Sequence, residues 1–474
     1  MDRADVLVVG GGVMGAAVVA RLSQTTARVL LVEEQDDLAE GASKANAGIA
    51  TSFYGRPGTL EARLIAESNP RWENLCGRLD VPYRRIGAVM VAVGPEEAAG
   101  LPAVYEAIVA QGARAELVTA EQARDLEPLI TGDCSGGISL PDEGIIDPMR
   151  LTVAYAELAA LNGATIERSR RVTGFSVADG ELKEAETTGG PVRARFVVNA
   201  AGLFADEVSR MAGGESFRMW PRQGQYWILD RAFGSRLRRL VYPIPMEHTR
   251  GAQVVLTTNG SVLLGPSAAD IELRFDKATD LATLRWLLEQ TRKLVPDVSD
   301  EYAIKTYAGN RPAGDEIFRT RFDHNIRNLI HVGSRSAGVS VSPALGDHVL
   351  GLLRDAGLEA IDRAEAADAI PTVPRLLNAA DPEQLPSFDP RYRQVVCACE
   401  QVTAAEISAA LESRVPATSI DGVRKRTRAT GGRCQGSVCM VGVAFLVSQH
   451  TGQPPECIRH GGWGGTLGVG HADC

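Results

Sequence analysis

The chain has 474 residues and carries 59 acidic against 50 basic side chains, a formal net charge of −9 at pH 7. This length predicts two or three domains, and the acidic balance argues against a nucleic-acid binder. No apolar run approaches the roughly 18 residues of a membrane-spanning helix, and the N-terminus does not resemble a signal peptide, so we expect a cytoplasmic protein with at most peripheral membrane association.

The N-terminal residues predict a dinucleotide-binding unit. A β-rich run at 5–9 (DVLVV) leads into Gly10, Gly12 and Gly15, spaced G-x-G-x-x-G. In such a unit the first glycine makes a tight turn, the second lets the backbone approach a pyrophosphate, and the third allows close helix–strand packing. A helix-like segment and a second strand follow, and that strand ends in Glu33, where an acid accepts ribose hydroxyls. This complete context favours a dinucleotide site over an ordinary glycine-rich turn.

Three later segments of small residues indicate that the cofactor is extended. They are GASKANAG at 41–48, the turn after the strand RFVV at 195–198, and the turn after the apolar run at 329–332. Contacts spread over the chain suit a cofactor that threads through the fold, whereas a nicotinamide enzyme more often keeps its contacts within one compact half. The pattern therefore favours FAD over NAD.

The middle of the chain offers candidates for substrate binding. His248 and Arg250 lie in the loop MEHTRGA between strand-like segments, and Arg311 follows the turn at Gly309. Arginine can grip a carboxylate or phosphate with two parallel bonds, so Arg311 is the candidate anchor for an anionic substrate. A structural salt bridge is the alternative for Arg311. His248 is a candidate base, with a solvent-facing loop histidine as the alternative.

Six of the eight cysteines lie after position 396 and indicate a metal site. A proline-rich segment at 366–393 reads as a linker, and Thr403 with Glu406 gives a capping-box signature beyond it. Four of these cysteines are spaced as two pairs: Cys397, Cys399, Cys434 and Cys439. Four thiolates at one point indicate zinc or an iron–sulfur cluster, and the one-residue gap in the first pair counts against zinc. Unmetallated thiols are the third possibility.

Two other C-terminal features carry alternatives. The basic run at 424–428 is typical of a solvated helix face, or else compensates an anionic cluster or docks an acidic electron-transfer partner. The tail at 453–474 is rich in glycine. It is expected to be a contact segment rather than a further metal site, although it contains Cys457, His460, His471 and Cys474.

These segments resemble the D-amino-acid-oxidase-like superfamily of flavoproteins, and within it the glycerol-3-phosphate dehydrogenase and L-2-hydroxyglutarate oxidase branch. The resemblance covers about residues 1–360 and is carried by GGGVMG, GASKANAGIATSFYGRPGTLEARL, VPYRRIGAVMVA, VVNAAGLFAD, SVLLGPSAAD, AGNRPAGDE and SRSAGVSVSPALGDHV. The segments VCACEQVT and TRATGGRCQGSVC resemble the bacterioferritin-associated-ferredoxin-like [2Fe-2S] domain of anaerobic glycerol-3-phosphate dehydrogenase large subunits.

The resemblance implies specific contacts to a non-covalent FAD and a [2Fe-2S] cluster. The implied FAD contacts are Gly10, Gly12, Val13, Met14, Gly15, Glu33, Ser43, Lys44, Asn46, Ala47, Val172, Ala201, Gly202, Gly338, Val339 and Ser340. The four paired cysteines become the cluster ligands. At the flavin's pyrimidine edge, a helix beginning near Gly338 would stabilise negative charge on the reduced ring.

One position departs from the branch. Thr51 stands where members usually carry a histidine near the flavin, and a threonine hydroxyl is a poor base near neutral pH. The catalytic candidates are therefore Arg311, His248, Thr51 and Arg250, with the identity of the base left open.

The implied fold is α/β, with a Rossmann-like FAD-binding domain interleaved with a mainly β substrate domain and followed by a small helical [2Fe-2S] domain. The expected boundaries are 1–83, 146–214 and 306–365 for FAD binding, 84–145 and 215–305 for the substrate domain, 366–393 for the linker, 394–452 for the cluster domain and 453–474 for the tail.

A flavin accepts two electrons as hydride, whereas a [2Fe-2S] cluster carries one at a time, so a chain with both is expected to hand electrons on singly. We expect a dehydrogenase that oxidises a small anionic alcohol, glycerol 3-phosphate or a 2-hydroxy acid, and passes electrons through the cluster to a redox partner subunit in a hetero-oligomer. The alternatives are an amino-acid or secondary-amine dehydrogenase, and an electron-transfer subunit with a vestigial substrate site. The sequence leaves open the substrate, the electron acceptor and the oligomeric state.

Overall fold

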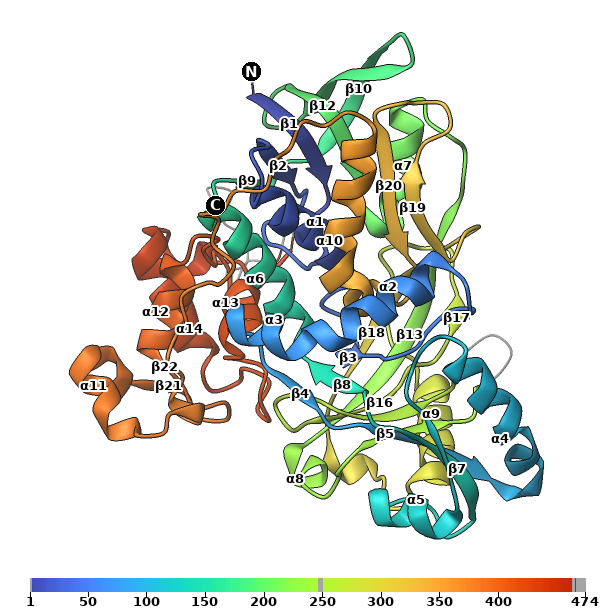
Figure 1. Cartoon of the computed structure of the whole chain (residues 1–474). Coiled ribbons are helices and arrows are strands. Elements are labelled where there is room, and N and C mark those ends of the chain that lie inside the picture. The colour runs from blue at the N-terminus through green and yellow to red at the C-terminus, as the bar shows by residue number, and fades with distance from the viewer. Residues whose placement is uncertain (1, 246–249, 463–464, 466–474) are drawn as a thin grey trace.

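The computed structural model describes residues 2–245, 250–462 and 465, which form two large sheets, two small sheets and the helices around them (Figure 1). Half of the predicted tail and the candidate base His248 lie outside the described residues. Within the described part of the chain, no helix is both long and apolar enough to cross a bilayer.

The first large sheet has eight strands and contains the dinucleotide motif. Its strands are β1 (Asp2–Val9), β2 (Val29–Val32), β9 (Thr165–Glu167), β10 (Val172–Ala178), β11 (Glu181–Thr187), β12 (Val192–Asn199), β19 (Phe318–Phe322) and β20 (Leu329–Ser334). Five of them form a parallel centre in the order β9-β2-β1-β12-β20, and β10, β11 and β19 pair antiparallel. The buried parts of the central strands, VLVV of β1, VLLV of β2 and FVV of β12, are apolar because both faces of the sheet are covered there.

The two faces of this sheet are covered differently. The helices of this region are α1 (Val13–Ser23), α2 (Leu60–Ser68), η1 (Asn69–Arg71), α3 (Trp72–Arg78), α6 (Pro148–Leu161), η2 (Gly202–Phe204), α7 (Ala205–Met211) and α10 (Gly338–Asp355). Val6 and Val8 of β1 pack with α1 and α10, whereas Leu7 and Val9 face α7 and the β10–β11 hairpin. This alternation along β1 follows the two-residue period of a strand and leaves the β1–α1 turn open at the strand's carboxyl end.

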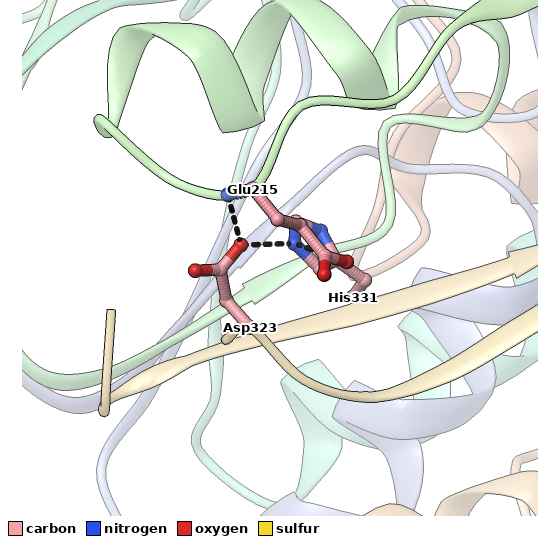
Figure 2. A group of neighbouring side chains, drawn as sticks. All are labelled: Glu215, Asp323 and His331. Carbon is pink, nitrogen blue, oxygen red and sulfur yellow. Dashed lines mark hydrogen bonds and ion pairs between the residues drawn. The ribbon is translucent and has the colours of Figure 1, made fainter. Parts of the chain in front are cut away.

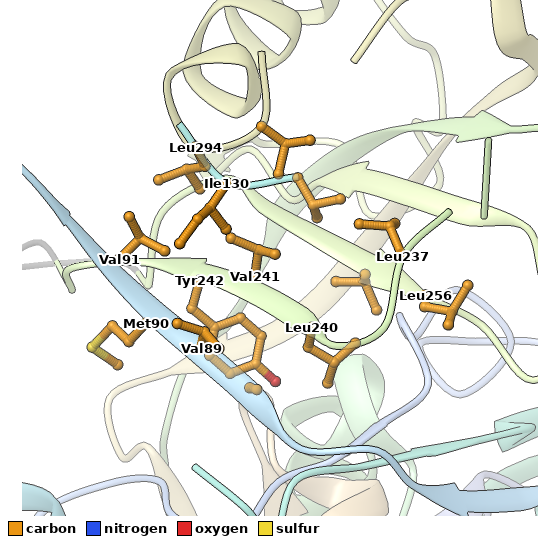
Figure 3. Close-up of a cluster of buried hydrophobic side chains, with 14 of the residues drawn as sticks. Val89, Met90, Val91, Ile130, Leu237, Leu240, Val241, Tyr242, Leu256 and Leu294 are labelled. Atoms are coloured by element: carbon orange, nitrogen blue, oxygen red, sulfur yellow. The ribbon is translucent and has the colours of Figure 1, made fainter. Parts of the chain in front are cut away.

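The second large sheet has nine strands and lies beside the first (Figure 1). Its strands are β5 (Ala88–Val93), β6 (Glu116–Val118), β7 (Cys134–Leu140), β13 (Met219–Leu229), β14 (Leu240–Pro243), β15 (Gln253–Leu256), β16 (Val262–Gly265), β17 (Ala269–Asp270) and β18 (Ala303–Gly314). Its helices are α4 (Gly94–Val109), α5 (Ala120–Leu126), α8 (Arg231–Gly234), α9 (Leu281–Leu294) and η3 (Asp300–Tyr302). Figure 3 shows its core, in which Val89, Val91 and Tyr242 pack against residues of neighbouring elements.

Strand β18 crosses the domain boundary expected between residues 305 and 306. It pairs antiparallel with β13 from Ala303 to Gly314, so the second sheet continues past that boundary. The prediction placed the strand's second half with the cofactor domain because AGNRPAGDE belongs to the family pattern. A strand hydrogen-bonded along its whole length cannot be divided in this way, and the register brings Arg311 opposite Arg222.

A three-stranded sheet of β3 (Ile49–Ala50), β8 (Gly144–Ile146) and β4 (Tyr83–Arg85) joins the two large sheets. The C-terminal region contains η4 (Leu376–Asn378), η5 (Pro382–Gln384), α11 (Leu385–Phe388), η6 (Pro390–Arg393), β21 (Val395–Cys397), β22 (Val402–Thr403), α12 (Ala404–Glu412), α13 (Ile420–Thr427), α14 (Met440–Thr451) and η7 (Pro455–Cys457). Thr403 and Glu406 form the capping box that their spacing indicates at the start of α12.

The basic run on α13 is not the solvated helix face that the sequence suggested. Lys425 and Arg426 are only 1% and 7% exposed, and both pair with Asp37 of the first domain, Arg426 at 2.8 Å and Lys425 at 3.4 Å. Glu40 also pairs with Lys425. Charges this deeply buried need partners, and here the partner carboxylates lie nearly four hundred residues away in the sequence. The run therefore docks the C-terminal domain onto the loop that follows Glu33.

Candidate active site

A cavity of about 1780 Å³ is lined by residues of the first large sheet's region, the second large sheet's region and the C-terminal region. Nearly all the predicted cofactor contacts line this cavity. The predicted residues that line it are Gly10, Gly12, Val13, Met14, Glu33, Ser43, Lys44, Asn46, Ala47, Val172, Ala201, Gly202, Gly338, Val339 and Ser340. Of the catalytic candidates, Thr51, Arg250 and Arg311 line it too. Segments far apart in sequence thus meet around one elongated space, as an extended dinucleotide requires.

The three motif glycines differ in what a side chain would meet. Gly10 has φ +109°, and a Cβ there would lie 2.5 Å from the Ala200 oxygen. A Cβ at Gly15 would overlap the Gly10 oxygen, so Gly15 serves the packing of α1 rather than lining the cavity. At Gly12 the nearest atom would be Ser43 Oγ at 3.4 Å, and the space beyond is the cavity. Gly12 is also the N-cap of α1 and has no side chain to cap it; the Val13 N–H donates to the Ser43 hydroxyl at 2.9 Å, and Gly12, Val13 and Met14 line the cavity, so the helix terminus faces the space where a phosphate would bind.

Glu33, which the sequence predicts to bind the adenosine ribose, is held by two backbone N–H groups. Its Oε2 accepts the Gly11 N–H at 2.7 Å, and its Oε1 accepts the Gln35 N–H at 2.9 Å. Burial nevertheless raises the pKa of this carboxyl to about 7, despite the two N–H groups that favour its charged form. A ligand that donates ribose hydroxyls to the carboxylate would favour the ionised form further.

The raised pKa of Glu33 predicts how FAD affinity depends on pH. Because the hydroxyls bind the ionised carboxylate, FAD binding should tighten as pH rises through about 7 and level off above it. Between pH 6 and pH 8 the affinity of the apoprotein should rise by about tenfold. Titration of apoprotein with FAD, followed by flavin fluorescence, measures this change. Glu33→Gln removes the titrating group, so an equally steep pH dependence in that variant would contradict the assignment.

A second helix terminus lies in the cavity wall beside the start of α1. Helix α10 begins at Gly338 without a side-chain cap, and a Cβ on Gly338 would lie 3.3 Å from Met14 near the start of α1. Ser340, in the first turn of α10, accepts the Thr51 N–H at 3.0 Å and donates to the Ile49 oxygen at 3.3 Å. An uncapped helix terminus in the cavity wall can stabilise negative charge on a reduced flavin ring.

The Lys44 side chain is paired with carboxylates of the protein, whereas the sequence predicted that Lys44 contacts the cofactor. Its ammonium group pairs with Glu40 at 2.6 Å and with Asp421 of α13 at 3.0 Å. It therefore helps to dock the C-terminal domain. A contact of the Lys44 main chain with the cofactor stays a prediction.

Arg311 carries a charge that the described protein leaves without a counter-ion. Its Nε donates to the Arg222 oxygen at 3.3 Å and its Nη2 to the Ser267 oxygen at 2.8 Å, and it forms no ion pair with any described residue. Burial lowers the pKa of its guanidinium. Its neighbour Arg222 differs, because that side chain is neutralised by Asp270 at 2.6 Å. Arg311 is thus a cation suited to receive an anion in the cavity.

Thr51 and Arg250 lie together at the same end. Arg250 donates to the Thr51 hydroxyl at 3.3 Å and to the Phe53 oxygen, and its guanidinium lies 4.2 Å above the Phe53 ring. Arg335, from the turn before α10, also lines the cavity and was missed by sequence reasoning. So was Glu143, whose fully buried carboxyl accepts hydrogen bonds from Thr51, Ser52 and Tyr242. The sequence beside Glu143 gave little signal, because the residue follows Asp142 in the polar turn that precedes β8.

The four paired cysteines lie close together in the C-terminal domain, and none of them is in a disulfide. They approach as two pairs, Cys399 with Cys434 and Cys397 with Cys439. The N–H groups of Val438 and Gly436 lower the pKa of the Cys434 thiol. Two neighbouring pairs of thiols suit a binuclear cluster, in which each iron takes two cysteine ligands.

A different polar group lies at the edge of the first sheet, where Glu215, Asp323 and His331 meet (Figure 2). Asp323 lies 2.9 Å from His331 Nε2 and accepts the Glu215 N–H at 2.8 Å. Arg319 and Arg321 both pair with Glu215. Two guanidinium groups already neutralise this cluster, so it stabilises the sheet edge and none of its three residues lines the cavity.

Comparisons with known proteins match both the main part of the chain and its C-terminal region to sequence families. Residues 5–352 match the sequence model of the FAD dependent oxidoreductase family, and residues 395–448 match that of the BFD-like [2Fe-2S] binding domain. The glycerol 3-phosphate dehydrogenase of Caloramator mitchellensis is 29% identical over 456 residues, 94% of each chain. The anaerobic glycerol-3-phosphate dehydrogenase subunit A1 of Haloferax volcanii is 28% identical and covers 92% of this chain and 81% of that protein. The structure of dithionite-reduced L-alpha-glycerophosphate oxidase from Mycoplasma pneumoniae with FAD bound matches with a TM-score of 0.74 at 26% identity, over 79% of this chain and 100% of that one.

Proposed function

The chain belongs to the FAD dependent oxidoreductase family and carries a C-terminal BFD-like [2Fe-2S] binding domain, and from this premise we propose that it dehydrogenates a small anionic alcohol. The predicted family, α/β fold class, enzyme class and both cofactors are confirmed. The finer proposal is that the substrate is glycerol 3-phosphate or a 2-hydroxy acid, and that electrons leave through the cluster to a partner protein.

The observation that carries the proposal is the unpaired Arg311 in the cofactor cavity. A half-buried guanidinium bonded only to carbonyl oxygens has its charge uncompensated, and a phosphate or carboxylate would supply the missing counter-ion. Arg250 and Arg335 line the same cavity and add to its positive potential. The named relatives include glycerol 3-phosphate enzymes, which supports an anionic alcohol as the substrate class.

The position of the C-terminal domain supports the proposed electron route. Gly431 and Gln435, which lie three residues and one residue from Cys434, line the same cavity as the FAD motif. Arg428 also approaches Asp147 of the first domain at 3.9 Å. A flavin bound in this cavity would accept a hydride from the substrate, and a [2Fe-2S] cluster held by the cysteines nearby would pass the electrons on singly. A relative named as subunit A1 of an anaerobic enzyme supports a partner subunit as the acceptor.

Anaerobic mixing of the purified protein with candidate substrates tests the substrate class. We expect glycerol 3-phosphate or a 2-hydroxy acid to bleach the oxidised flavin, and glycine, proline and secondary amines not to do so. Bleaching by an amine alone would reassign the enzyme to C–N oxidation. No bleaching by either class, with photoreduction intact, would point to an electron-transfer subunit with a vestigial substrate site.

Replacement of Arg311 tests the anion anchor. Arg311→Lys keeps the charge but loses the two-pronged geometry, so KM for the anionic substrate should rise by about tenfold or more while FAD content stays normal. Steady-state kinetics with the flavin spectrum as a check measures both. Arg292→Lys, at a surface arginine paired with Asp300, is the matched control and should change neither. An unchanged KM in Arg311→Lys would move the anchor to Arg250.

A further inference from the structure

Glu143 is a buried carboxyl group at the junction of the two large sheets. It lies in the turn between β7 and β8 and is 0% exposed. Its Oε1 accepts the Ser52 N–H at 2.6 Å and the Ser52 hydroxyl at 2.7 Å, and the Thr51 hydroxyl lies 3.0 Å away. Its Oε2 accepts the Tyr242 hydroxyl at 2.8 Å. A carboxyl group can be buried at low cost only when its oxygens are satisfied in this way.

The donors to Glu143 come from the two segments that form the substrate end of the cavity. Thr51 and Ser52 belong to the loop after β3. Tyr242 lies on β14, just before the chain segment that returns with Arg250, and its ring is packed in the core shown in Figure 3. The Glu143 carboxyl therefore ties a loop of the cofactor domain to a strand of the substrate domain.

Arg250 depends on the loop that Glu143 holds. Among the described residues, both hydrogen-bond acceptors of its guanidinium belong to that loop, the Thr51 hydroxyl and the Phe53 oxygen. The guanidinium also lies 4.2 Å from the centre of the Phe53 ring and 4.8 Å from that of Tyr54. These contacts fix the direction in which Arg250 meets the cavity, so a shift of the loop would move the charge.

The same loop reaches the start of α10. The Thr51 N–H donates to the Ser340 hydroxyl at 3.0 Å, and Ser340 is in the cavity wall. The hydrogen-bonded path thus runs from Tyr242 through Glu143 and Thr51 to the helix terminus at the flavin end. Glu143 itself is not among the residues that line the cavity.

We propose that Glu143 is a positioning residue that holds the 51–53 loop and thereby aims the Arg250 guanidinium at the substrate anion. This role rests on the proposed function, because it assumes an anion at that end of the cavity. Glu143 acts without touching the substrate. The arrangement also gives Thr51 a role in place of proton transfer, since its hydroxyl accepts from Arg250 and faces two acceptors for its own proton, the Phe53 oxygen at 2.9 Å and Glu143 Oε1 at 3.0 Å.

Three substitutions in the FAD-loaded protein test the proposal. Glu143→Gln removes the negative charge and replaces one acceptor oxygen by an NH₂ donor, and Tyr242→Phe removes a single bond to the carboxyl. Tyr302→Phe changes another tyrosine of the same domain, packed against Phe233, and is the matched control. We expect KM for the anionic substrate to rise about tenfold in Glu143→Gln and about threefold in Tyr242→Phe, with kcat within about twofold and FAD content normal. The control should match the wild type.

Coupling to Arg250 separates positioning from a general structural effect. In an Arg250→Ala background, Tyr242→Phe should raise KM no further, because the residue through which it acts is gone. Equal effects of Tyr242→Phe in both backgrounds would overturn the proposal. If Glu143→Gln fails to fold, the KM values of Tyr242→Phe, Arg250→Ala and the double variant are sufficient to test the proposal.

Binding of inorganic phosphate keeps the test independent of turnover. Its dissociation constant, measured from the perturbed flavin spectrum, should rise in parallel with KM in each variant. If no anionic alcohol reduces the wild-type flavin, the proposed function fails. The phosphate dissociation constants of the variants still test the positioning role of Glu143 in that case. Unchanged phosphate affinity in both Glu143→Gln and Tyr242→Phe, or no phosphate binding by the wild type, would overturn the positioning role.

Discussion

Gly12→Val should purify without yellow colour, because its side chain fills the space that the cofactor's pyrophosphate needs. The backbone at Gly12 has φ −74° and ψ 174°, which valine adopts without strain, and the nearest atom to an added Cβ is Ser43 Oγ at 3.4 Å. The protein fold should therefore tolerate the substitution. The helix terminus would lose its approach to the phosphates, and we expect FAD binding to weaken by on the order of a hundredfold or more.

The measurement is the FAD content of purified protein, with circular dichroism as the check on folding. Gly100→Val in α4 is the matched control, because a Cβ there meets no atom within 4 Å and Gly100 does not line the cavity. That variant should keep its FAD. A Gly12→Val protein with the normal FAD content would show that this turn does not hold the cofactor. Substitution of Gly15 would be less informative, since its Cβ would clash with Gly10 and disturb the fold itself.

Cys434→Ser should lose the [2Fe-2S] cluster and keep FAD. A serine hydroxyl is a poor ligand for iron, and Cys434 has the thiol whose pKa is lowered by backbone N–H groups. The predicted FAD contacts lie outside the matched cluster domain, and the ion pairs of Lys425 and Arg426 with Asp37 do not involve the cysteines. Substrate should still bleach the flavin, whereas reduction of a one-electron acceptor should fall by on the order of a hundredfold.

Iron and sulfide analysis, electron paramagnetic resonance of the reduced protein and acceptor kinetics check this prediction. Cys134→Ser, at a buried cysteine on β7, is the control and should retain the cluster. Stoichiometric zinc without iron or sulfide in the wild type would refute the cluster. If Cys434→Ser turns over at the wild-type rate with dioxygen as sole acceptor, the cluster is structural and the enzyme is an oxidase.

The C-terminal domain is docked directly on the first domain, and this docking determines what is expected of the Cys434→Ser variant. The proline-rich segment at 366–393 suggested a tethered domain, yet Lys44 and Asp421 join the two domains directly. Asp37 and Glu40 follow Glu33 by only a few residues, so the docking contacts lie beside the proposed adenosine site. Loss of the cluster is thus expected to leave the domain in place, because buried ion pairs hold it there.

The sequence by itself determined the features whose signals are local. Gly10, Gly12 and Gly15 stand within six residues, and their spacing is that of a strand, turn and helix. The paired cysteines, the capping box at Thr403 and the strand–turn segments around the cavity were readable for the same reason. Each is a short pattern that the backbone imposes on its own neighbours, so no knowledge of distant contacts was needed.

Only the tertiary structure decided the features that depend on distant partners. Glu143 meets Ser52 across 91 positions and Tyr242 across 99, and Arg426 meets Asp37 across 389. Nothing in the sequence beside these residues marks such pairs, and a charged run such as 424–428 reads as solvated until its buried counter-ions are known. Likewise, β18 was divided wrongly because its partner β13 lies about ninety residues earlier. A buried charge is stable only through the groups packed around it, and chain folding alone brings those groups together.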